Sequence, residues 1–106
     1  RYLTSINHPD VILPALDDQQ EHVWHLFVIK TNHRDSLKKY LDSNNVQTLV
    51  HYPVPPHHQI AYEELKHLDL PVSESLHNSV LSLPMDPTMT EAEIEYVIKT
   101  MNGWLL

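Results

Sequence analysis

One stretch of nine residues, His51 to Gln59 (His-Tyr-Pro-Val-Pro-Pro-His-His-Gln), limits how this 106-residue chain can fold more than any other. Proline fixes φ and removes a backbone donor, so the stretch can form neither a central strand nor the interior of a helix. Each residue before a proline is held in extended geometry. The preceding apolar run, residues 46–50, reads as a strand. We therefore expect a stiff loop at a strand end, with imidazoles and a phenol held in fixed directions.

Length and composition define the class of protein. The chain is long enough for one domain, and 42% of its residues are hydrophobic, enough for a core. Seven basic and fourteen acidic residues give a net charge of −7, which disfavours a nucleic-acid-binding face. No apolar run approaches the roughly 20 residues of a membrane span, and residues 1–14 do not resemble a signal peptide. The absence of cysteine excludes disulfides and thiolate metal sites and fits a cytoplasmic protein.

Two features predict that the chain is a fragment of a longer protein. It begins with Arg1 rather than methionine, in what reads as the end of a helix. Its single glycine, Gly103, lies almost at the other end. Sites for phosphate-bearing cofactors usually include glycine-rich turns, so we expect any such site to lie on polypeptide outside this sequence.

Hydrophobic periodicity predicts an α/β domain with a small, mostly antiparallel sheet and helices packed on one side of it. Continuous apolarity marks the central strand. Strands are expected at residues 11–13, 22–30 (the central one), 46–50 and 81–83. Helices are expected at residues 1–7, 32–44, 59–68, 71–80 and 90–102.

Particular residues should define the helix ends and faces. Thr90 and Glu93 have the spacing of a capping box, and Asn32 is expected to cap the helix that follows it. Several apolar residues of the two helices after the proline–histidine stretch are expected to face the core: Ile60, Ala61, Leu65, Val72, Leu76 and Val80.

The residues alone leave the chemistry open. His51, His57 and His58 are the only local cluster among nine histidines. A zinc site needs three or four converging ligands, which the prolines permit but do not require, so we expect no metal. The chain has neither a Gly-x-Ser-x-Gly elbow nor a cysteine nucleophile. Two readings remain: a stand-alone module that binds a metal or small ligand at residues 51–59, and an interaction domain that uses residues 104–106.

The sequence also contains an ordered set of segments that resemble a known family. They are Trp24–Thr31, Arg34–Leu37, Tyr40–Leu41, Val46–His57, Leu81–Met85 and Met89–Ile94. In this order they resemble the C-terminal part of the DegT-type sugar-nucleotide aminotransferases, over about residues 22–102. Within that family the chain looks most similar to enzymes that make 3-amino-3,6-dideoxyhexoses on a dTDP carrier.

The resemblance implies a fold type I enzyme that depends on pyridoxal 5'-phosphate and is usually a homodimer with active sites between subunits. Such an enzyme transfers an amino group from glutamate to a keto-sugar nucleotide, here a dTDP-3-keto-6-deoxyhexose, for cell-surface polysaccharide biosynthesis. Residues 1–106 would be its small C-terminal domain. The absent large domain would carry the Schiff-base lysine and bind most of the cofactor, so this chain would contain no catalytic residue and be inactive alone.

The same resemblance assigns residues to the substrate cleft. His51 and Tyr52 match the family positions nearest the sugar and the cofactor. His57 lies on the same loop, and we expect it to bind substrate as well. We expect His58 to lie on the surface.

Overall fold

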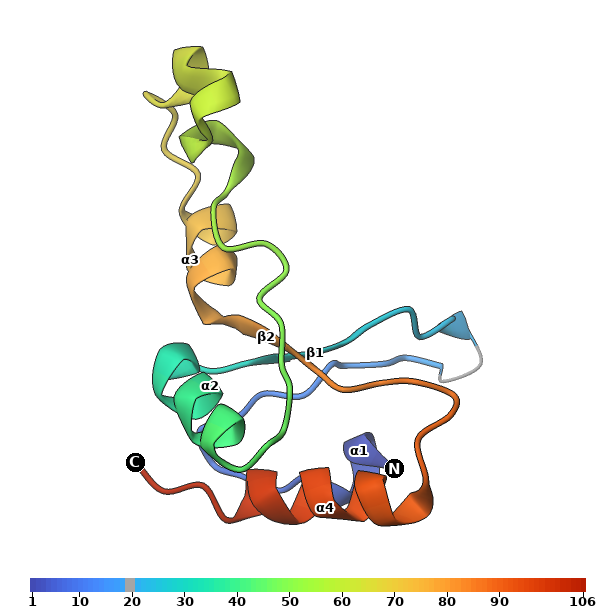
Figure 1. Ribbon diagram of the computed structural model, residues 1–106. Coiled ribbons are helices and arrows are strands. Elements are labelled where there is room, and N and C mark those ends of the chain that lie inside the picture. Colours follow the sequence, from blue (N-terminus) through green and yellow to red (C-terminus); the bar gives the residue numbers. More distant parts are fainter. Residues whose placement is uncertain (19–20) are drawn as a thin grey trace.

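The computed structural model describes residues 1–18 and 21–106 and shows a compact body from which a long arm extends (Figure 1). We define the arm as residues 52–79. The Cα radius of gyration is 15.4 Å and the molecule measures 48 × 33 × 26 Å. A compact domain of this length has a radius of gyration of about 13 Å. The arm, drawn from green to gold in Figure 1, accounts for the elongation.

The sheet of the body consists of two antiparallel strands, β1 (Phe27–Lys30) and β2 (Val80–Leu83). Phe27 pairs with Leu83 and Lys30 with Val80. The predicted strand at 22–30 is therefore too long at its start, because Trp24 adopts a positive φ of 47° that turns the chain before Phe27. Side chains of β1 alternate between buried and half-buried, so the strand is not fully buried on both faces as predicted.

Two other predicted strands are single bridges in the structure. Residues 11–13 contribute only the antiparallel bridge between Ile12 and Lys30. Residues 46–50 contribute only the bridge between Leu49 and Ser82. Their neighbours follow β1 and β2 without pairing further, so the prediction of full strands was wrong. The prediction of a strand at 81–83 is confirmed.

Three helices belong to the body: α1 (Tyr2–Ser5), α2 (Arg34–Ser43) and α4 (Glu91–Asn102). In Figure 1 they all lie below the strands, on the opposite side from the arm. The core combines side chains from these helices and both strands. Its buried members are Tyr2, Ile6, Phe27, Ile29, Leu37, Leu41, Val46, Leu81, Leu83, Val97, Ile98, Met101 and Trp104.

The helix ends follow local sequence rules. The predicted capping box of α4 is present, with the Thr90 hydroxyl accepting from the Glu93 backbone and the Glu93 carboxylate accepting from Thr90. The α2 helix ends where Asn45 adopts a left-handed φ of 59°, a conformation that asparagine tolerates. At its start, His33 rather than Asn32 occupies the cap position, and without a side-chain hydrogen bond.

The arm contains η2 (Pro56–His58), η3 (Ile60–Leu65) and α3 (Pro71–Ser79). The prediction that its apolar residues face the core was wrong. Ile60 is 94% exposed and Val72 is 73% exposed, and Ala61, Leu65 and Leu76 are also exposed. The reason is geometric, because the arm points away from the body (Figure 1) and these side chains stay exposed.

The predicted fold class, a small α/β domain with an antiparallel sheet and helices packed on it, is confirmed. Across the described residues, every helix is too short or too polar to cross a bilayer.

Candidate functional site

His51 is held at the point where the arm leaves the body. Its Nδ1 atom lies 2.8 Å from the Ser82 hydroxyl oxygen. Ser82 is buried in β2, and its backbone amide and carbonyl both pair with Leu49. A side chain on a paired strand is a rigid support, so the imidazole is fixed relative to the sheet.

Tyr52 follows His51 and is far more exposed. Its ring meets the His51 ring edge-on, with centroids 5.7 Å apart and planes at 83°. The peptide bond between the two residues is cis. The carbonyl oxygen of Tyr52 is hydrogen-bonded to Nδ1 of His77 on α3, and the Tyr52 residue is 69% exposed. The structure thus fixes the backbone of Tyr52 and leaves its phenol accessible.

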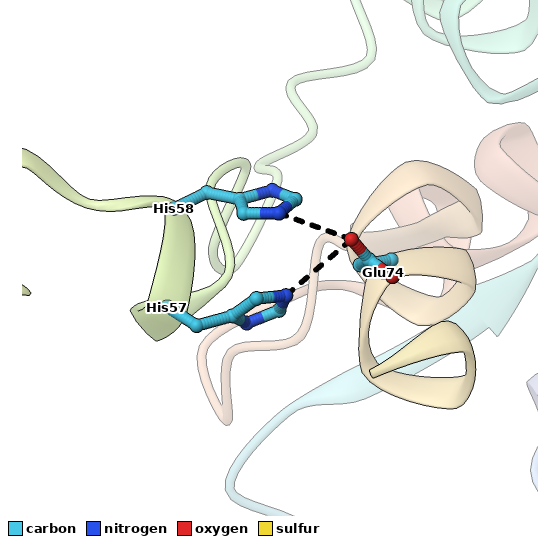
Figure 2. Close-up of side chains that lie close together, drawn as sticks. All are labelled: His57, His58 and Glu74. Carbon is cyan, nitrogen blue, oxygen red and sulfur yellow. Dashed lines mark ion pairs between the residues drawn. The ribbon is translucent and has the colours of Figure 1, made fainter. Parts of the chain in front are cut away.

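His57 and His58 form a second cluster, with Glu74 of α3 (Figure 2). The Nε2 atoms of His57 and His58 lie 3.4 Å and 3.0 Å from the same Glu74 oxygen, Oε1. His57 is only 2% exposed, whereas the His58 side chain is 43% exposed, as expected for a surface residue. His57 therefore faces Glu74 and His58, and its contacts differ from those of His51 and Tyr52.

The sequence alone missed three residues that shape these groups: Glu74, His77 and Ser82. Each comes from a segment far along the chain from the residue it contacts, and although Ser82 lies in the family-like segment Leu81–Met85, nothing in the sequence links it to His51. Only the return of the chain through α3 and β2 brings them to residues 51–58.

Two cavities lie in the body, away from these residues. One, of about 360 Å³, is lined mainly by apolar side chains of α1, residues 24–27 and residues 84–94. The other, of about 760 Å³, lies between residues 42–47 and α4 and is more open and polar. Neither is lined by His51, Tyr52 or His57. Tyr52 is exposed, His51 is half-buried and His57 is buried, so the three residues differ in their access to solvent and share neither cavity.

The model of the DegT/DnrJ/EryC1/StrS aminotransferase family matches residues 2–102, nearly the whole chain. The chain belongs to this family. The family predicted from the ordered segments is therefore confirmed, and the match includes both the proline–histidine stretch and α4.

Comparisons with individual proteins and solved structures agree with this family assignment. The chain is 45% identical to the dTDP-3-amino-3,6-dideoxy-alpha-D-galactopyranose transaminase of Aneurinibacillus thermoaerophilus, over 97% of this chain and 28% of that protein. The crystal structure of S. venezuelae DesV in complex with a ketimine intermediate matches with a TM-score of 0.89 and 37% identity, over 97% of this chain and 29% of DesV. NtdA from Bacillus subtilis with bound PMP matches with a TM-score of 0.80 and 33% identity, over 95% of this chain and 25% of NtdA. The chain thus spans less than a third of each of these family members.

The family implies a pyridoxal phosphate cofactor, but the residues of this chain do not fit one by themselves. Of the five lysines, Lys30 is half-buried at the end of β1, Lys38 is paired with Asp42 and Lys66 with Glu63, and Lys39 and Lys99 are exposed. Neither of the two cavities has a lysine in its lining. The one glycine ends α4 rather than forming a phosphate-binding turn. No catalytic step through the cofactor can therefore be assigned to this chain alone.

Proposed function

We propose that this chain is the C-terminal domain of a longer pyridoxal-phosphate-dependent aminotransferase. The enzyme transfers an amino group from glutamate to a keto-sugar nucleotide, a dTDP-3-keto-6-deoxyhexose, for cell-surface polysaccharide biosynthesis in the cytoplasm. The large domain carries the Schiff-base lysine and most of the cofactor site. The extent of the match supports this proposal, because the chain corresponds to only 28% of its relative from A. thermoaerophilus.

The main support for a substrate-binding role of this chain is the pair of His51 and Tyr52, which are held in place next to each other. The imidazole is anchored on Ser82, and the phenol next to it is exposed. Imidazole and phenol groups both donate and accept hydrogen bonds, as recognition of sugar hydroxyls or a diphosphate requires. We assign His51 and Tyr52 to one wall of the substrate cleft, with His57 on the same loop.

The apolar surface of the arm supports the proposed homodimer. Nine large apolar side chains of the arm are exposed: Tyr52, Val54, Ile60, Tyr62, Leu65, Leu68, Leu70, Val72 and Leu76. All nine lie within residues 52–76, and large exposed apolar patches on soluble proteins usually mark an interface. In the proposed enzyme this surface packs against the large domains of the dimer, which also brings the base of the arm to the active site.

The first test of the proposal is a transamination assay on residues 1–106 alone, with pyridoxal phosphate, glutamate and the keto-sugar nucleotide supplied. We expect no turnover, because the chain lacks a lysine suited to the cofactor. Measurable turnover would show that the chain is a complete enzyme and would overturn the domain assignment.

The second test is His51→Ala in the longer enzyme, with His67→Ala as the control. His67 is an exposed arm histidine whose ring contacts the nearby backbone carbonyl of Glu64. We expect His51→Ala to raise the KM for the sugar nucleotide about tenfold, the effect of losing roughly 1.4 kcal/mol of binding, with cofactor content unchanged. If His51→Ala and His67→Ala behave alike, residues 51–52 do not bind substrate.

A further inference from the structure

We propose that His57, His58 and Glu74 form a binding site for a divalent transition-metal ion, with Zn²⁺ the best match. The three ligand atoms are Nε2 of each histidine and Oε1 of the glutamate. This site is separate from the substrate role proposed above for His51 and Tyr52, and it makes His57 a metal ligand in place of the substrate contact expected from the sequence. The argument for it stands whether or not the chain belongs to a larger enzyme.

The first argument is distance. The three ligand atoms lie within 4.8 Å of one another. The two histidine nitrogens are 3.4 Å and 3.0 Å from Glu74 Oε1. Bonds of about 2.0–2.1 Å meeting at a tetrahedral zinc place neighbouring ligand atoms roughly 3.4 Å apart. Both histidine–glutamate pairs are therefore within a few tenths of an ångström of this spacing, and the two histidine nitrogens lie within 4.8 Å of each other.

The second argument is independent and concerns the burial of His57. Its ring is almost fully buried, yet neither ring nitrogen has a hydrogen-bond partner among the described residues. Buried polar atoms in proteins are nearly always paired, because an unpaired one costs roughly 1–3 kcal/mol. The contact with Glu74 lacks hydrogen-bond geometry, so this carboxylate does not satisfy the ring. A metal ion bound to Nε2 provides the partner that the protein atoms do not.

The third argument is how the ligands converge. His57 and His58 are adjacent in η2, and their ring centroids lie only 4.1 Å apart. Figure 2 shows both rings directed from η2 toward Glu74 on the facing helix α3. Pro55 and Pro56 restrict the backbone at the start of this turn. The ligands are therefore held by two separate elements before an ion arrives.

The donor set determines the type of ion. Two imidazoles and one carboxylate suit zinc and neighbouring transition metals, whereas Mg²⁺ and Ca²⁺ prefer oxygen ligands. Three protein ligands leave a fourth position for water. The half-exposed side chains of His58 and Glu74 provide the path by which the ion enters.

Metal binding would stiffen the arm. The ion would join η2 to α3, which run on the two sides of the arm. The same helix α3 carries His77, which holds the backbone of Tyr52. Zinc would therefore reduce the motion of α3 and, through His77, of Tyr52.

The test uses the complete protein, treated with a chelator and then titrated with Zn²⁺ against a chromophoric competitor. We expect one tight equivalent per chain. His58→Ala and Glu74→Gln should each weaken it at least tenfold, and both positions are sufficiently exposed to tolerate the change. His67→Ala, an exposed arm histidine outside the cluster, should leave the affinity unchanged.

A spectroscopic measurement identifies the ligands directly. Zinc should shift the ring nitrogen NMR signals of His57 and His58 and leave those of His67 in place. The proposal is overturned if no Zn²⁺ binds at micromolar concentration. It is equally overturned if bound Zn²⁺ is unaffected by His58→Ala and Glu74→Gln, since that result means adventitious binding by surface histidines.

Discussion

The hydrogen bond between Ser82 and His51 provides the most specific test of how the substrate-binding residues are supported. Ser82→Ala removes only the hydroxyl group, and the strand pairing of β2 remains because it uses backbone atoms. The loss leaves Nδ1 of a half-buried imidazole without its 2.8 Å partner. A lost hydrogen bond that leaves such a group unpaired costs about 1–2 kcal/mol. If this energy orients His51, substrate binding should weaken roughly five- to thirtyfold.

Ser79→Ala is the matched control. Ser79 is equally buried and lies just before β2, but its hydroxyl donates to the Ser75 carbonyl within α3, 2.7 Å away. Both variants therefore remove one buried hydroxyl, and only Ser82→Ala disturbs His51. In the longer enzyme, the KM for the sugar nucleotide should rise with Ser82→Ala and stay near the parent value with Ser79→Ala, with cofactor content equal in both.

A second readout separates orientation from general damage. Ring nitrogen NMR signals report which nitrogen of His51 carries the proton, and Ser82→Ala should change that tautomer balance while Ser79→Ala does not. Equal KM values and equal His51 signals in the two variants would refute the reasoning, because Ser82 would then have no influence on the imidazole.

Two further predictions concern the stability of the body. Burial raises the pKa of the Tyr2 phenol from 10.0 to about 12. Above pH 10 the unfolded chain releases this proton while the folded chain retains it, so folding free energy is lost as the pH rises from about 10 through about 12. Tyr2→Phe should remove this component of the pH dependence, measured by urea unfolding at pH 8, 10 and 11. At pH 8 the variant should lose about 1 kcal/mol of folding free energy, because the hydrogen bond to the Pro84 carbonyl is gone. Parallel pH profiles of folding free energy for the two proteins would contradict the prediction. Thr90→Ala removes the capping box with Glu93 and should cost about 1 kcal/mol, seen as a fall in Tm of roughly 4–8 °C, whereas an unchanged Tm would mean that the cap contributes nothing.

Features encoded by neighbouring residues were predictable from the sequence. The capping box of α4 and the extent of this helix depend on residues within one short segment, and both are present in the structure. The end of α2 at Asn44 and Asn45 is equally local. The strand at 22–30 was predicted too long because a positive φ at Trp24 is decided by packing, which periodicity does not record.

Features that depend on the rest of the fold were not predictable. The apolar periodicity of residues 60–76 identifies apolar side chains, but it does not tell whether they pack on the core, and in the structure they are exposed. The same limit applies to His57. Its sequence neighbours place it on the loop. Only the folded structure, in which α3 lies next to η2, shows that His57 faces Glu74.

The base of the arm determines how changes in the arm affect the stability of the body. The bridge between Leu49 and Ser82 and the hydrogen bond between His51 and Ser82 hold the outgoing and returning segments together. Both ends of the arm are therefore fixed side by side in the body, so the arm is a closed loop. The entropy cost of closing such a loop grows slowly with length, by about 0.6 kcal/mol for each doubling. Changes in length at the exposed outer end of the arm, residues 60–70, should therefore cost the body little stability.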